Sequence, residues 1–453
     1  MLDVIHLLIP GLTGIYTAFH LYARATSPKQ SKVSNPNFNV FQRSYLIPYL
    51  LATLADWFQA PYLYKLYHYY GFLEQQIAVI YVVGFISTVI ASTLASTLVH
   101  KAKRKQFVLV LTTVNIVSCL TKLSWNYHVL LVGRILAGFS ITLLFSFYQE
   151  WYVYQHNDFH GFPEEWIELT FNKAAFWNGV LAVACGLVSH FFADTLALTP
   201  VAPFMLAIPL LILSACIIVT NWDENCGNPS IKFRTLCVEG LKDILLNKSI
   251  MLLAIVQSLF EGALYLYVFL WTPVLDGPGK PIGMIFALFM LCIIIGSPLQ
   301  VIMTTKLKVS TATVPIVVCL LGLCSSLCLT YATHPATQSW NLSLFGILLF
   351  ELACGIHIPS INKLQSVVFK DNTVGVVNWV RVPVNVIACA CLMSLHGSSD
   401  NMGTHKLFMI CSGLLLVAVF VASVLRCVVG SDTGNGNTPG LSRSSSYSGN
   451  ITA

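Results

Sequence analysis

Charged side chains are scarce in this chain. Lys, Arg, Asp and Glu make up only 10% of its 453 residues, whereas apolar residue types make up 56%. A soluble globular domain carries about 25% charged residues, so this composition excludes an ordinary soluble protein. The formal net charge is +6. The basic residues cluster between apolar stretches and form no broad basic face, so nucleic acid is not an expected partner.

Signals of catalysis or of a bound metal are also lacking. No pair of cysteines has the spacing of a metal finger with accompanying His, and no His/Asp pair, Cys/His arrangement or Gly-rich phosphate loop stands out. Most of the 14 cysteines lie in apolar runs, where packing accounts for them. We therefore expect no metal, no cofactor and no catalytic residue, which means a protein that is not an enzyme.

Long apolar runs are present instead. A membrane-spanning helix needs about 20 mainly apolar residues. The stretches that meet this requirement form one N-terminal candidate, a group of six, and a second group of six after a polar stretch. They are Leu2–Tyr22; Tyr45–Leu66, Ile77–Val99, Phe107–Leu123, Val129–Phe147, Ala174–Phe192 and Val201–Val219; and Ile250–Trp271, Ile282–Val301, Thr313–Tyr331, Leu342–Ile361, Val374–Leu395 and Leu407–Val429.

These runs predict an all-α membrane protein in five parts. The first run has no basic region before it and carries Asp3, so we expect a retained helix rather than a cleaved signal. The expected parts are an N-terminal helix and basic linker (1–44), a first six-helix bundle (45–220), a central loop (221–248), a second six-helix bundle (249–429) and a disordered tail rich in Gly, Ser and Asn (430–453).

The basic residues predict the topology. Most of the Lys and Arg residues outside the spans fall in loops that would lie on one side, including Lys101–Lys105 and the central loop. Loops on the cytoplasmic side carry an excess of Lys and Arg. The sequence therefore predicts a cytosolic central loop and a cytosolic C-terminal tail.

Short strings recur at an offset of about 200 residues. Ala60–Tyr64 in the first span of the first bundle resembles Ala263–Tyr267 in the first span of the second. Trp177-Asn178 and Asn378-Trp379 also occupy corresponding spans. Transporters built from repeats place substrate near the middle of the membrane, where the halves meet. The sequence thus predicts two related six-helix halves.

Carboxylates inside the spans are the main functional signal. An ionised side chain at the centre of a bilayer costs about 2.5–3.5 kcal/mol, so such residues usually face a polar cavity or a partner charge. We predict that Asp56, Glu261 and Glu351 are proton-coupling or gating residues, with a structural ion pair or a helix cap as the alternative. Glu150 lies near the end of its span, where solvation is the simpler explanation.

Cations and polar donors inside the spans suggest an anionic substrate. Arg offers a planar fork of donors to an oxyanion and Lys offers a point charge. For Lys and Arg, snorkelling to the lipid headgroups is the alternative, and for Asn it is a contact that holds two helices together. Tyr pairs at i and i+2 point to different faces, so one of each pair should pack. The predicted substrate-binding residues are Arg381, Lys173, Arg134, Tyr62, Tyr64, Tyr265, Tyr267, Asn178 and Asn378.

The arrangement of six spans, a basic loop and six more spans resembles the major facilitator superfamily. Gly133–Gly138 resembles its Arg-x-x-x-Gly motif. In the loop after the second span, His100 and Lys103 stand where relatives have Asp and Gly. The loop therefore lacks the Asp with which those relatives form a charge pair. Longer strings resemble the molybdate-anion transporter family, namely Ala55–Tyr67, Ala174–Val183, Leu259–Asp276, Glu351–Ser360 and Asn378–Asn385.

This resemblance implies a secondary active transporter of the plasma membrane that takes up molybdate by alternating access. Partners would be a small inorganic anion, the lipid bilayer and, if uptake is coupled, protons. Two alternatives remain open from the residues alone. One is a transporter of a sugar or an organic anion, and the other is a membrane sensor or scaffold of the same fold that transports nothing.

Overall fold

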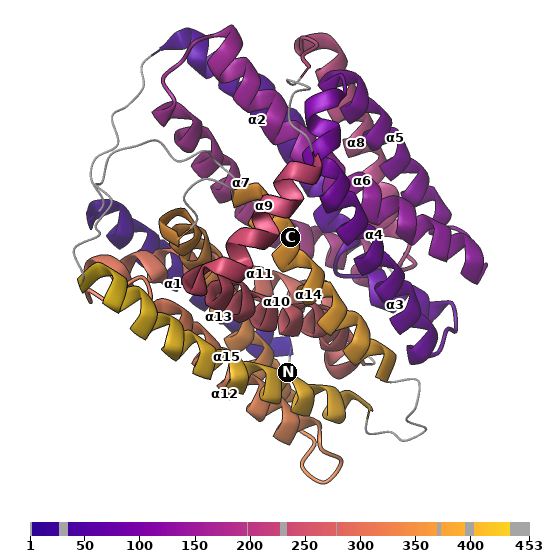
Figure 1. The fold of residues 1–453 in the computed structure, drawn as a ribbon. Coiled ribbons are helices and arrows are strands. Elements are labelled where there is room, and N and C mark those ends of the chain that lie inside the picture. Colours follow the sequence, from indigo (N-terminus) through magenta and orange to yellow (C-terminus); the bar gives the residue numbers. More distant parts are fainter. Residues whose placement is uncertain are drawn as a thin grey trace. The chain divides into compact units, whose positions relative to one another are not determined.

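The computed structural model describes residues 2–26, 35–196, 198–226, 233–277, 279–368, 373–394 and 403–434. Within these ranges the chain folds into fifteen α-helices and two π-helical turns, and its only β-pairing is a single bridge between Lys103 and Cys226 (Figure 1). The prediction of an all-α fold is therefore confirmed.

The helices divide into two compact units. The first unit, called the first half below, contains α2 (Pro36–Gln59), α3 (Leu63–Tyr69), α4 (Glu74–Lys101), α5 (Arg104–Thr121), α6 (Tyr127–Tyr154), α7 (Glu165–His190) and α8 (Ala202–Asn221). The second half contains α10 (Lys248–Leu275), α11 (Ile282–Thr305), α12 (Val314–Thr333), α13 (Trp340–Val368), α14 (Thr373–Met393) and α15 (Gly403–Gly434).

The two halves repeat one pattern of helix packing. In the first half α2 packs against α6, α7 and α8, while α6 packs against α4 and α5, and α5 against α8. In the second half α10 packs against α13, α14 and α15, while α13 packs against α11 and α12, and α12 against α15. Each pair in one list has its counterpart in the other when α3 is counted as a continuation of α2. The predicted repeat of six helices is confirmed.

Two further helices stand outside this pattern. Helix α1 (Leu2–Thr26) packs against α11 and therefore belongs to the second half, although the first half follows it in the chain. Helix α9 (Phe233–Leu246) lies in the predicted central loop. The expected tail begins inside α15, which continues to Gly434, and residues 435–453 lie outside the described part of the chain.

Of the described helices, nine are long and apolar enough to span a membrane: α4, α6, α7, α8, α10, α11, α12, α13 and α15. The other four predicted spans, which lie in α1, α2, α5 and α14, are helices too. In α14 the described apolar part is the shorter stretch Trp379–Met393. Helix α2 begins at Pro36, earlier than expected, and so includes Gln42 and Arg43; α5 begins with Arg104 and Lys105. Length and apolarity alone therefore miss α2 and α5, which carry charged and polar residues.

Caps and prolines define how α2 begins and bends. The side chain of Asn35 accepts hydrogen bonds from the backbone N–H groups of Asn37 and Phe38, which closes the first turn. Pro48 lies inside the helix and lacks the N–H that would bond the carbonyl of Ser44. The indole of Trp222, just beyond α8, donates to that Ser44 carbonyl at 2.9 Å. A residue of another segment thus satisfies the group that the proline leaves free.

Glycines bring α11 and α13 into backbone contact. A Cβ added at Gly296 would overlap the backbone of Gly355, and a Cβ added at Gly355 would overlap the carbonyl of Ile293. Small residues allow this close approach in membrane helices, where packing rather than the hydrophobic effect holds helices together. The contact fixes the register of this helix pair of the second half.

One methyl group at this contact tests the register. We expect Gly296→Ala to lower the melting temperature of the detergent-solubilised protein, because overpacking a close contact costs about 1–3 kcal/mol. Gly413→Ala is the matched control, since an added Cβ at Gly413 has no heavy atom within 4 Å. Equal melting temperatures for the two variants would contradict the backbone contact.

Candidate functional site

A carboxylate and a guanidinium meet inside the first half. Asp56, in the last turn of α2, interacts electrostatically with Arg134 of α6. The Arg134 guanidinium lies 5.3 Å from the centre of the Tyr81 ring and occupies the space that a side chain at Gly84 would fill. Its Nε is buried and has no hydrogen-bond partner among the described residues. This donor is therefore buried against Gly84 without an acceptor among the described residues.

The Arg-x-x-x-Gly motif has a packing reason here. A Cβ at Gly138 would crowd the side chain of Ser87 and the backbone of Gly84, so the glycine lets α6 approach α4 closely. Arg134, one turn away, then lies across Gly84 on the same neighbouring helix. The motif thus joins a cation, Arg134, to a glycine, Gly138, whose lack of a side chain lets the neighbouring helix lie close to that cation.

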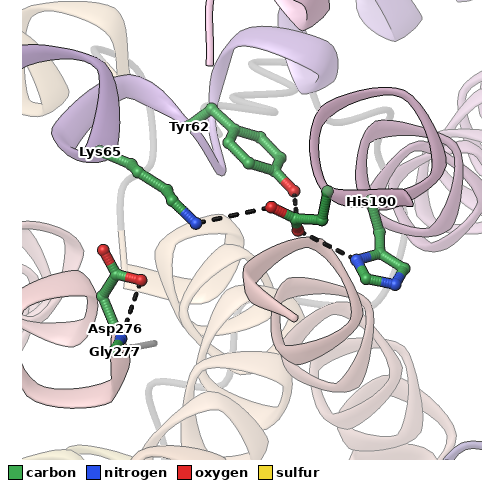
Figure 2. A network of polar contacts seen from close by, with 6 residues as sticks. Tyr62, Lys65, His190, Asp276 and Gly277 are labelled. Carbon is green, nitrogen blue, oxygen red and sulfur yellow. Dashed lines mark hydrogen bonds and ion pairs between the residues drawn. The ribbon is translucent and has the colours of Figure 1, made fainter. Parts of the chain in front are cut away.

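Four residues form a second polar group in the first half, called the Asp194 cluster below. Asp194 lies in a π-helical turn, Phe191–Thr195, that continues α7. Its carboxylate accepts a hydrogen bond of 2.6 Å from the Tyr62 hydroxyl and lies 3.5 Å from Lys65 Nζ and 3.0 Å from His190 Nδ1. Figure 2 shows Tyr62, Lys65 and His190 pointing toward this shared group. The cluster ties α3 to the end of α7.

The remaining polar residues of the first half are held by neighbours. Lys173 of α7 donates to Gln42 Oε1 at 2.8 Å. Asn178 Oδ1 accepts a hydrogen bond of 2.6 Å from the Trp57 indole. Tyr64 is buried, with 4% of its surface exposed. These three predicted ligands therefore lie against α2 or inside the half, and nothing in the contacts singles out one substrate position.

A chain of polar contacts crosses three helices of the second half, called the Glu261 cluster below. Gln365 of α13 donates to Gln257 of α10 at 2.7 Å, and Gln257 donates to Glu261 Oε1 at 2.7 Å. His357 Nε2 lies 3.5 Å from the same carboxylate oxygen. Arg381 of α14 interacts electrostatically with Glu261. A carboxylate, an imidazole and a guanidinium thus share one region of the half.

The two tyrosines of α10 have different surroundings. Tyr265 interacts electrostatically with Glu261 and Arg381, so it belongs to the Glu261 cluster. Tyr267 packs on the Phe350 ring at 3.6 Å between centroids, and its hydroxyl lies 3.0 Å from Ser325 Oγ. Tyr267 therefore lies in the packed interior.

Glu351 on α13 differs from the other carboxylates. It lies near Tyr267, Cys292 and Cys354. It makes no ion pair or hydrogen bond among the described residues. The side chain of Asn378, the last predicted ligand, lies outside the described part of the chain, although its backbone belongs to α14.

Glu150 takes part in a third polar group, at the start of α5. Arg104, with 2% of its surface exposed, lies 3.8 Å from Glu150 and donates to Asn225 at 3.4 Å. Glu224 accepts from the backbone N–H of Lys105 at 2.9 Å. The basic loop is therefore fastened to the end of α6 and to the segment after α8. These contacts were not predicted from the sequence.

Several site residues escaped the sequence analysis. Asp194 lies just beyond the end of its predicted span, His190 and His357 stand alone in the sequence as imidazoles, and Gln257 and Gln365 are uncharged. Polar residues within apolar runs were the available signal for His190, His357 and Gln257. No group of three or more metal-ligating side chains occurs within the described ranges.

Comparison with known proteins identifies the class of this fold. The solved structure of the nucleoside transporter NupG superposes with a TM-score of 0.66 and covers 85% of this chain and 98% of its own, at 11% identity. A family model described as sugar transporters with 12 transmembrane helices matches residues 4–350. The chain is a multi-pass membrane transporter of the major facilitator superfamily.

Full-length relatives narrow the class. The molybdate-anion transporter of Xenopus tropicalis is 38% identical over 437 residues and covers 96% of both chains. The molybdate-anion transporter of Danio rerio is 39% identical over 456 residues, covering 93% of this chain and 95% of its own. The chain belongs to the molybdate-anion transporter family of this superfamily, which confirms the resemblance found in the sequence. It is a transporter and not an enzyme.

Removing the acceptor of the Asp194 cluster should destabilise the first half. We expect Asp194→Ala to lower the melting temperature, because it leaves the hydroxyl of Tyr62, a fully buried residue, without this acceptor at a cost of about 1–3 kcal/mol.

Two matched variants separate this hydrogen bond from the surrounding charges. Asp194→Asn keeps an oxygen that can accept from Tyr62, and Lys65→Met removes only a partly exposed cation. Both should lower the melting temperature less than Asp194→Ala does. If Asp194→Ala proves as stable as Asp194→Asn, the hydrogen bond contributes nothing.

Proposed function

We propose that this protein is a secondary active transporter that moves molybdate into the cell by alternating access. One observation carries the proposal: 38% identity, over 96% of both chains, to a protein named molybdate-anion transporter. The two six-helix halves supply the architecture, and cations inside both halves supply chemistry suited to an oxyanion.

Contacts of the candidate ligands support a ranking among them. Arg381 and Tyr265 lie together beside Glu261, and Arg134 has a buried Nε without a hydrogen-bond partner among the described residues. Within the second half we assign the main oxyanion contacts to Arg381 and Tyr265, and Arg134 is the candidate cation of the first half. The other predicted ligands contact neighbours away from Glu261, or in the last case have a side chain outside the described residues: Lys173, Asn178, Tyr62, Tyr267, Tyr64 and Asn378.

The charge of the cargo supports coupling to protons. Molybdate is a dianion, and each negative charge moved inward against about 100 mV costs about 2.3 kcal/mol. For two charges the cost is about 4.6 kcal/mol, which at equilibrium would deplete the cell by more than about a thousandfold. Two protons carried with the anion would cancel this charge. Asp56, Glu261 and Glu351 are the proposed carriers.

We place the protein in the plasma membrane, in contact with the lipid bilayer and with a cytosolic tail. The excess of Lys and Arg in the Lys101–Lys105 loop and the central loop supports this orientation. A short epitope tag after Ala453 should be stained in intact cells only after permeabilisation, whereas a tag before Met1 should be stained without it. Staining in the opposite order would invert the proposed topology.

A sugar is the second candidate cargo, because the family model that matches the chain is described as sugar transporters. Purified protein in liposomes separates the two. We expect uptake of radiolabelled molybdate that unlabelled molybdate abolishes and glucose leaves unchanged. Uptake of labelled glucose in place of molybdate would favour the sugar, and no flux of either cargo would favour a sensor or scaffold.

Removing the Arg381 charge should weaken molybdate uptake. A hydrogen bond to a charged group contributes about 1.5–3 kcal/mol, so Arg381→Gln should raise the molybdate concentration for half-maximal uptake by about ten- to a hundredfold. Arg426→Gln, which changes an exposed Arg of α15, is the matched control and should leave uptake unchanged. Equal uptake by both variants would remove Arg381 from the binding site.

A further inference from the structure

His357 is a buried imidazole placed beside a carboxylate. It lies on α13, with 5% of its side chain exposed, and its Nε2 lies 3.5 Å from Glu261 Oε1 on α10. The ring packs against Phe260 at 4.3 Å between centroids. Its Nε2 makes no hydrogen bond within the described residues. The geometry thus offers Nε2 one partner, the carboxylate.

Two glutamine side chains also hold the carboxylate in place. Gln257 donates to the same Oε1, and Gln365 fixes the amide of Gln257 in the orientation that makes this possible. Because neither amide can take up or release a proton, this chain orients Glu261 without changing its charge. An added proton therefore has to reside on the imidazole or on the carboxylate.

The charges of the cluster link that proton to an anion. With His357 neutral, the negative Glu261 and the positive Arg381 balance each other. A proton on the pair leaves the cluster with one net positive charge, which is costly inside the protein unless an anion is present. An oxyanion next to Arg381 would offset that charge. Linkage is reciprocal, so the proton strengthens anion binding by the factor with which the anion strengthens proton binding.

We propose that His357 and Glu261 together hold one of the protons that are co-transported with the anion, with His357 as its acceptor. This inference rests on the proposed function and adds a coupling residue to it. It also ranks the carboxylates. Asp56 lies beside Arg134, and Glu351 makes no ion pair or hydrogen bond within the described ranges. Among the described residues neither has an imidazole with which to share a proton.

The other titratable groups around the pair are few. Glu261 interacts electrostatically with Arg381 on α14, Tyr265 on α10 and Cys354 on α13. Helix α12, which also packs against α10, contains no Asp, Glu, Lys, Arg or His. The charged and His residues of α15 lie in its first turn and its last three turns. They are His405, Lys406, Arg426 and Asp432.

Proton release and uptake can be measured directly. Purified full-length protein in weakly buffered detergent solution is mixed with molybdate while an indicator dye reports the pH. We expect the wild type to take up protons when it binds the anion. His357→Gln, which keeps a donor but cannot be protonated, should take up fewer protons, by at most one per molecule. Glu261→Gln should show the same loss. His128→Gln, at an exposed His of α6, is the control and should behave as the wild type.

Transport in liposomes provides the second readout. One coupled proton converts a pH difference of one unit into about tenfold accumulation. We expect His357→Gln to lose this tenfold factor while exchange of labelled for unlabelled molybdate, which needs no net proton movement, continues. Continued exchange also shows that the variant is folded.

Four outcomes decide the matter. Wild-type protein that binds molybdate without taking up a proton overturns the inference, whatever the variants do. Unchanged proton uptake and accumulation in His357→Gln also overturns it. So does a loss of coupling in Asp56→Asn or Glu351→Gln when His357→Gln and Glu261→Gln keep their coupling. A wild type that neither binds nor moves molybdate rejects the proposed function itself, which is a distinct result.

Discussion

An ionised side chain inside an apolar span has to be balanced by a partner, because leaving it alone in a medium of low dielectric constant costs several kcal/mol. This constraint determines much of how each half is held together. Asp56 and Arg134 join α2 to α6, and Glu261 joins α10 to α13 through His357. The helices that these partners connect are the same counterparts in the repeated packing pattern of the two halves. In both halves, therefore, the charged pairs join helices that also pack against each other.

The same constraint applies to the backbone. Proline in α2 leaves the carbonyl of Ser44 without its helical partner, and the indole of Trp222 donates to it from beyond α8. The Trp222 ring also stacks on Trp151 at 3.7 Å between centroids, with Tyr148 against its edge. A polar requirement of one helix is therefore met by an aromatic group that also forms part of the apolar core. In the first half, the same side chain thus donates a hydrogen bond to the backbone and fills space in the apolar interior.

The spans and the repeat could be predicted from the sequence because apolar runs and repeated strings are local properties of the chain. The pairing of polar groups could not. Tyr62 and Asp194 lie 132 residues apart and meet only because a π-helical turn extends α7. His357 looked like one imidazole in an apolar run, and its meaning depends on Glu261, which belongs to another helix. The fastening of Arg104 to Glu150 depends likewise on how α5 meets α6. Such contacts follow from tertiary packing, which no local pattern encodes.

The glycine contact between α11 and α13 has a mechanical consequence. Two backbones that touch at Gly296 and Gly355 leave no intervening side chains to repack, so we expect the two helices to move together as one body. His357 lies less than one turn beyond Gly355, whereas Glu261 lies on α10. Any tilt of that body against α10 changes the separation of imidazole and carboxylate. The strength of the contact between imidazole and carboxylate therefore depends on the conformation of the second half.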